Sequence, residues 1–175
     1  MNVVWYIILF LTLALVAWQD FKSRSIYWWL PVLIGISGFF IAHERLETAT
    51  VFTQILLNLF FSLLILSVVV LYVFIRYRTL KAFTSERFGL GDILMLLAVC
   101  PLFPLVSFVV FLCLSNLLIL LIELILRITV RQNVRSIPYA GYLSVFLMIL
   151  TVCGFFIPDI NFQSDIAGYF LFSGN

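Results

Sequence analysis

Charged residues are scarce in this sequence: Asp, Glu, Lys and Arg together make up 10% of its 175 residues. A soluble domain is about a quarter charged and roughly half apolar, whereas 65% of this chain is hydrophobic. A fold surrounded by water cannot hide that much apolar surface. The shortage of charge therefore excludes an ordinary soluble domain and indicates contact with a lipid bilayer.

Basic runs and cysteine pairs are also missing. The net charge is only +2, and no cluster of Lys and Arg is present for a phosphate backbone to bind, so we expect no nucleic-acid partner. Cys100, Cys113 and Cys153 lie far apart in apolar stretches. Because no CxxC pair occurs, the sequence argues against a zinc site or a disulfide framework.

Hydrophobic runs separated by polar loops fill most of the chain, with no internal repeat and no low-complexity linker. We therefore expect one domain over residues 1–175: an all-α polytopic membrane protein of about six transmembrane helices. The runs that stand apart most clearly are residues 2–19, 26–42, 51–75 and 142–157.

The apolar stretch from Ile93 to Leu126 is too long for one span. A straight helix of that length would measure about 51 Å, against a hydrocarbon core of about 30 Å. Pro101 and Pro104 offer a break, because proline removes a backbone donor and clashes with the preceding turn. We expect two helices with a turn at these prolines, or alternatively a later turn near Ser115 and Asn116.

The basic residues predict an orientation. With six spans, the loops at residues 20–25, 76–91 and 127–141 share one side of the membrane, and all Lys and Arg residues except Arg45 fall in or beside them. The positive-inside rule then places these loops in the cytoplasm and both termini on the non-cytoplasmic side.

Two acidic residues could carry chemistry. Asp20 follows the first hydrophobic run and Asp92 precedes the fourth, so the expected topology brings both to the cytoplasmic face. Acids at the membrane boundary are costly and mark a functional site. Two close carboxyl groups share one proton, and one can then activate water while the other donates to a scissile carbonyl, as aspartic peptidases require.

The expected helix ends suggest different roles for the two acids. Asp92 would sit at a helix N-terminus, where the dipole favours the anion, and Asp20 at a helix C-terminus, where it favours the neutral acid. We therefore expect Asp92 to be the more readily ionised. Gly89 and Gly91 would adopt backbone angles closed to other residues and let a substrate chain approach closely.

Three segments of the chain resemble the type IV prepilin peptidases, a family of membrane aspartic peptidases with a GxGD motif. Residues 88–92, Phe-Gly-Leu-Gly-Asp, resemble the second catalytic segment of that family, and residues 20–26 resemble the first. Residues 136–143, which include Pro138, are similar to the segment before the last helix of the family. The chain differs from the family pattern at Tyr27, Trp28 and Leu94, and where Ala140 and Gly141 replace Gly-Pro.

The resemblance implies an aspartic endopeptidase with Asp20 and Asp92 as catalytic residues. Such enzymes remove a short basic leader from pilin-like precursor proteins at the cytoplasmic face of a bacterial or archaeal membrane. The chain resembles the short members, which lack the zinc-cysteine region and the methyltransferase activity. No metal or organic cofactor is implied, and the oligomeric state is left open.

Two other functions fit parts of the pattern. One is an intramembrane GxGD protease of the presenilin or signal-peptide-peptidase kind, although Gln19 precedes the first acid where those enzymes have tyrosine. The other is a non-catalytic membrane protein that acts in transport or assembly.

Other polar residues have structural interpretations. Arg24 could hold Asp20 or contact lipid phosphates. Glu123 is placed to pair with Arg127 one helical turn later. A stripe along the third run is typical of hydrogen bonds between membrane helices, and it consists of Gln54, Asn58 and Ser62.

Overall fold

The computed structural model describes residues 3–77, 89–130 and 137–156. In these residues all regular structure is helical. The elements are α1 (Val3–Ser23), α2 (Trp29–His43), α3 (Thr48–Tyr77), α5 (Leu90–Ala98), the short 3₁₀ helix η1 (Cys100–Leu102), α6 (Leu105–Val130) and α7 (Tyr139–Phe156).

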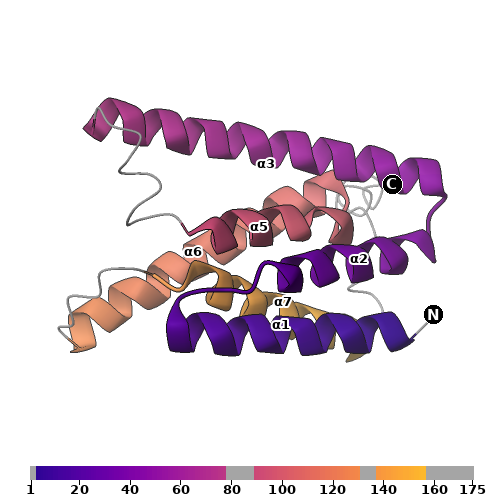
Figure 1. Ribbon diagram of the computed structural model, residues 1–175, viewed down its shortest axis with the longest axis horizontal. Coiled ribbons are helices and arrows are strands. Elements are labelled where there is room, and N and C mark those ends of the chain that lie inside the picture. The colour runs from indigo at the N-terminus through magenta and orange to yellow at the C-terminus, as the bar shows by residue number, and fades with distance from the viewer. Residues whose placement is uncertain (1–2, 78–88, 131–136, 157–175) are drawn as a thin grey trace, which may run out of the picture.

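The helices run alternately in opposite directions along one long axis (Figure 1). The C-terminal ends of α1, α3 and α6 and the N-terminal ends of α2, α5 and α7 all point toward the left in this view. We call this the acidic-pair end, because Asp20 and Asp92 occur in these helix ends. The alternating directions of the helices agree with the expected topology. Most residues of the loops at 76–91 and 127–141 lie outside the described part of the chain.

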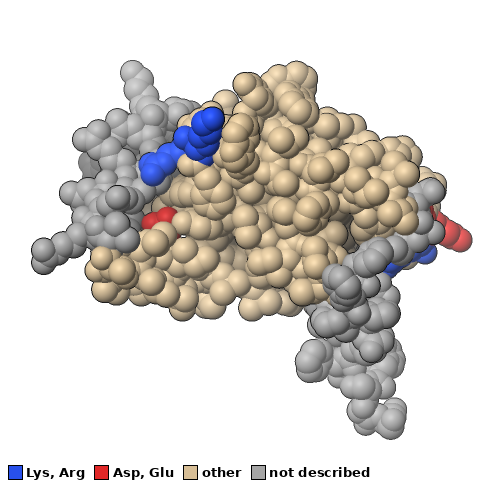
Figure 2. Space-filling view, turned by 90° about the horizontal axis from the view of Figure 1, so that it is seen from below, with Lys and Arg blue, Asp and Glu red and all other residues tan. Residues whose placement is uncertain are grey.

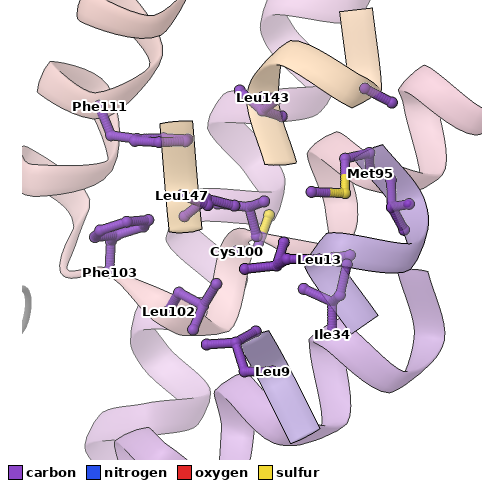
Figure 3. Close-up of a cluster of buried hydrophobic side chains, with 14 of the residues drawn as sticks. Leu9, Leu13, Ile34, Met95, Cys100, Leu102, Phe103, Phe111, Leu143 and Leu147 are labelled. Carbon is purple, nitrogen blue, oxygen red and sulfur yellow. The ribbon is translucent and has the colours of Figure 1, made fainter. Parts of the chain in front are cut away.

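The core lies where α1, α2, α5, η1 and α7 meet (Figure 3). One residue from each of these elements is at most 1% exposed: Leu13, Ile34, Met95, Cys100 and Leu143. The shortest helices, α5 and η1, therefore pack inside the bundle, while α1 is held on two sides by α2 and α7.

Apolar side chains also cover much of the outer surface. Three helical segments are long and apolar enough to cross a membrane: Val3–Ser23, Thr48–Tyr72 and Leu105–Leu126. On the face seen in Figure 2, the charged side chains of the described residues lie at the two ends of the molecule, with an uncharged surface between them. This distribution is consistent with a membrane protein, since charge is excluded from the hydrocarbon region.

The long apolar stretch does break at its prolines. Helix α5 ends at Ala98, η1 contains Pro101, and α6 begins directly after Pro104. The turn near Pro101–Pro104 is therefore confirmed, and Ser115 and Asn116 lie within α6. Helix α5 has 9 residues, about 13 Å, which is too short to span a bilayer by itself.

The buried side-chain amide of Asn58 joins α3 to the break between α5 and α6. The Asn58 Nδ2 group donates to the carbonyl oxygens of Cys100 at 2.8 Å and of Phe103 at 2.7 Å. One turn further along α3, the Ser62 hydroxyl contacts the Cys100 sulfur at 3.6 Å. The interhelical role predicted for the polar stripe is thus confirmed at Asn58 and Ser62. Prolines interrupt a helical ladder, and Asn58 satisfies carbonyls at that interruption.

Several expected helix ends were placed wrongly. The first helix does not stop at Gln19 but continues to Ser23, so Asp20 lies inside it. The last helix begins at Tyr139 rather than Tyr142, so Gly141 lies inside its first turn. Helix ends are weakly encoded, because terminal residues are fixed by packing as much as by local propensity.

Replacing Asn58 tests the fastening of α3. We expect Asn58→Leu to lower the free energy of unfolding by about 1–2 kcal/mol, because two buried interhelical hydrogen bonds are lost. The measurement is unfolding in mixed micelles titrated with sodium dodecyl sulfate. The control is Ser67→Ala, which removes an exposed hydroxyl bonded only within α3, to the Leu64 carbonyl. Equal unfolding curves for the two variants would contradict the prediction.

Candidate active site

Asp20 lies in the last turn of α1 and is 5% exposed. Its carbonyl oxygen accepts the Arg24 N–H at 2.9 Å, which closes the final turn. Arg24 has φ 51°, a left-handed conformation that ends the helix there. Because Asp20 is still helical, its side chain points across α1 into the bundle and not into a solvated turn.

The Asp20 carboxyl group meets the start of α7. Its Oδ2 accepts the Gly141 backbone N–H at 2.6 Å, across 121 positions of sequence. A Cβ atom on Gly141 would lie 3.1 Å from the same oxygen and 3.3 Å from the Asp20 Cβ. An added Cβ would therefore force the Asp20 side chain or the α7 backbone to move by a few tenths of an ångström.

Asp92 lies in the first turn of α5, at the third helical position. Its Oδ2 accepts the N–H of Gly89, the residue that caps the helix, at 3.3 Å. Its Oδ1 accepts the Ala140 N–H at 3.2 Å. The carboxyl group thus joins its own helix N-terminus to the first turn of α7.

The two acids consequently bind consecutive amides. Ala140 N–H points to Asp92 and Gly141 N–H points to Asp20. The first N–H groups of a helix have no partner within it and carry the positive end of its dipole. The start of α7 therefore holds both carboxyl groups side by side, and the Pro138 carbonyl begins the helical ladder by accepting the Tyr142 N–H at 3.1 Å.

The negative charge of Asp20 raises the pKa of Asp92. The pKa of Asp92 is raised from 3.8 to about 6, first by burial and second by the negative charge of Asp20. The hydrogen bonds from Gly89 and Ala140 oppose this rise. A pKa near 6 leaves Asp92 able to hold a proton close to neutral pH.

The contacts of the two acids favour a different division of roles from the one expected from their own helices. Asp20 accepts the shorter hydrogen bond, at 2.6 Å, and the positive charge of Arg24 acts on it. These interactions favour Asp20 as the ionised partner and Asp92 as the protonated one. The expectation considered only the helix to which each acid belongs, whereas α7 supplies its N-terminal amides to both.

Gly89 and Gly91 do not adopt the backbone angles that only glycine permits. No glycine among the described residues has a positive φ, and Gly89 is extended, with φ −72° and ψ 140°. At Gly91 an added Cβ would meet the Ile26 side chain at 3.1 Å. The space beside Gly91 is therefore filled by the segment between α1 and α2, so this glycine serves packing within the chain.

The amides of Ala140 and Gly141 were missed by the sequence reasoning. The expected helix began at Tyr142, which left both residues in a loop. The available signal was the position of Pro138, since proline commonly stands at the start of a helix.

Within the described residues, no group of three or more His, Cys, Asp or Glu side chains is arranged to hold a metal ion.

Removing the charge of Asp20 tests the coupling of the two acids. In Asp20→Asn we expect the pKa of Asp92 to fall from about 6 but to stay above its ordinary value, because burial is the larger cause. The measurement is a ¹³C NMR titration of the labelled Asp92 carboxyl carbon. Glu44→Gln is the control, since Glu44 is exposed at the opposite end of the molecule. An unchanged Asp92 pKa in Asp20→Asn would contradict the arrangement.

Comparisons of the chain with family models, with curated proteins and with solved structures found no match. The resemblance to prepilin peptidases therefore stays a prediction from three short segments. The site offers one buried and one half-buried carboxyl group, held by adjacent amides, of which one has a pKa suited to carrying a proton near neutral pH.

Proposed function

We propose that the chain is a membrane aspartic endopeptidase with Asp20 and Asp92 as its catalytic residues. One observation carries the proposal: side chains from α1 and α5 meet at consecutive N–H groups of α7, and the charge of one raises the pKa of the other. Paired carboxyl groups that share a proton are the chemical requirement of aspartic peptidases.

The reaction follows from the two protonation states. Ionised Asp20 takes a proton from a water molecule, and the water oxygen bonds to the scissile carbonyl carbon while protonated Asp92 gives its proton to the carbonyl oxygen. Asp20 then passes its proton to the leaving nitrogen. Asp92 recovers a proton as the carbonyl re-forms and the C–N bond breaks, which restores both starting states.

The resemblance to prepilin peptidases suggests the substrate. We propose pilin-like precursors, whose short basic leader is removed beside a hydrophobic helix that lies in the bilayer. Two features support this choice: both acids occur in terminal turns of helices, and the basic residues of the sequence cluster in loops on the same side. By the positive-inside rule this side faces the cytoplasm, with the six helices alternating in direction and both termini opposite.

The position of the acids also weighs against the alternatives. An intramembrane protease of the presenilin kind must cut within the apolar region, and a transporter usually places its acids near the bilayer midplane. Here Asp20 is in the last turn of α1 and Asp92 in the first turn of α5. Acids at helix ends suit cleavage at the membrane boundary.

Co-expression with a pilin-like precursor tests the proposal. We expect the leader to be removed by the unchanged chain, and Asp20→Asn and Asp92→Asn each to slow removal at least about a hundredfold, because each acid–base group contributes that much or more. Precursor and product are separated by gel electrophoresis and identified by mass spectrometry. Glu47→Gln, an exposed acid at the opposite end, should process normally. Full processing by either aspartate variant would exclude the mechanism.

Gly141 offers a second test. We expect Gly141→Ala to slow processing about tenfold, because the new Cβ would meet the Asp20 carboxyl at 3.1 Å and displace it. Gly35→Ala is the matched control, since a Cβ there meets its nearest atoms, in Ala98, at 3.9 Å. Both changes raise helix propensity equally, so an equal rate in the two variants would show that the Gly141 contact is unimportant.

A further inference from the structure

The connection between α1 and α2 passes beside the acid pair and turns inward at one residue. Within residues 21–29, Ile26 is the only one whose side chain is not exposed. It is half-buried and packs against the hydrophobic core. Ile26 therefore supplies the side-chain packing that holds this segment to the bundle.

Ile26 packs against the first turn of α5. A Cβ atom added to Gly91 would lie 3.1 Å from Ile26 Cδ1, 3.3 Å from its Cγ1 and 3.4 Å from its Cβ. These three nearest atoms all belong to one side chain, so Ile26 lies directly against the Gly91 backbone. The segment that follows the helix of Asp20 thus touches the helix of Asp92, one residue before that acid.

Backbone hydrogen bonds fix the course of the segment relative to Asp20. The Arg24 N–H donates to the Asp20 carbonyl oxygen at 2.9 Å. The Tyr27 N–H donates to the side-chain Oε1 of Gln19, the residue before Asp20, at 3.1 Å. Ile26 lies between these two donors along the chain. Its side chain is therefore held at a set place relative to Asp20.

The hydrogen bonds of Asp92 leave room for a further constraint on its position. Its carboxyl oxygens accept N–H groups at 3.2 and 3.3 Å, whereas Asp20 accepts one at 2.6 Å. Hydrogen bonds weaken as they lengthen, and the two residues that begin this turn, Gly89 and Leu90, are exposed. Packing against Gly91 is the inward contact that these bonds and residues do not supply.

We propose that Ile26 is a positioning residue for Asp92. Its contact with Gly91 sets how closely the first turn of α5 approaches the end of α1, and so whether the Asp92 carboxyl group reaches the Ala140 N–H. Close packing carries such a constraint, because an interior has little free volume to absorb a displaced side chain. The inference rests on the proposed peptidase function for its kinetic consequence, the rate of cleavage.

Moving one methyl group across this contact tests the proposal. Gly91→Ala adds a Cβ, and Ile26→Val removes Cδ1, the atom nearest to that Cβ. With a pilin-like precursor as substrate, we expect Gly91→Ala to lower kcat about tenfold at unchanged KM, because a misplaced acid slows the chemical step. Adding Ile26→Val should raise kcat again by about threefold or more, since a volume-conserving exchange is tolerated best.

The controls make the same changes away from the contact. Gly35→Ala adds a Cβ whose nearest atoms lie 3.9 Å away, and Ile36→Val shortens a side chain that is 42% exposed. Both should leave kcat within about twofold of the unchanged chain, because neither alters close packing.

Hydrogen exchange reports on the contact without cleavage. In Gly91→Ala we expect the Ala140 amide, which binds Asp92, to exchange about tenfold faster. The Gly141 amide, which binds Asp20, should exchange at its original rate. A general loosening of the fold would quicken both amides. Adding Ile26→Val should slow the exchange of Ala140 again.

The outcomes separate the inference from the proposed function. Wild-type kcat in Gly91→Ala, a double variant no faster than Gly91→Ala, or equal quickening of the Ala140 and Gly141 amides would overturn the inference. If the unchanged chain cleaves no precursor, the proposed function fails, and the exchange of the two amides then decides the role of Ile26. Should Gly91→Ala not fold, Ile26→Val by itself gives the test, and unchanged Ala140 exchange in it overturns the inference.

Discussion

The first turn of α7 is the point on which the site depends. One buried and one half-buried carboxyl group lie at one end of an apolar bundle, and a buried acid without partners is very costly. The chain meets this cost with two backbone amides, from Ala140 and Gly141. A helix N-terminus can do this because its first N–H groups are unpaired and its dipole favours negative charge. Since the two donors are consecutive, satisfying both acids also brings them together.

The short central helix makes this meeting possible. Because the chain breaks at Pro101 and Pro104, α5 is limited to 9 residues and packs inside the bundle next to α2 and α7. Asp92 thereby starts its helix beside α7. Asn58 of α3 donates hydrogen bonds to two carbonyl groups at the break. The position of one acid is thus set by a proline turn at the far end of its helix and by an amide from a third helix.

Electrostatics at the site cannot be assigned from single helices. Taken alone, the C-terminal position of Asp20 favours its neutral form and the N-terminal position of Asp92 favours its anion. In the folded chain α7 adds amides to both, Arg24 acts on Asp20, and burial together with the Asp20 charge raises the pKa of Asp92 to about 6. Burial and neighbours outweigh a terminal dipole, because the dipole effect is small and fades within one turn.

The sequence by itself determined the helical class, the need for a break in the long apolar stretch and the two acids as the residues to examine. These features are local: apolar runs, a missing backbone donor and rare charges are visible without a fold. Only the tertiary structure decided how the acids are held. Gly141 reaches Asp20 across 121 positions, Gly91 lies against Ile26, and Asn58 of α3 binds the carbonyl groups of Cys100 and Phe103. Such contacts join residues far apart along the chain, and they depend on packing and on helix ends that local sequence encodes only weakly.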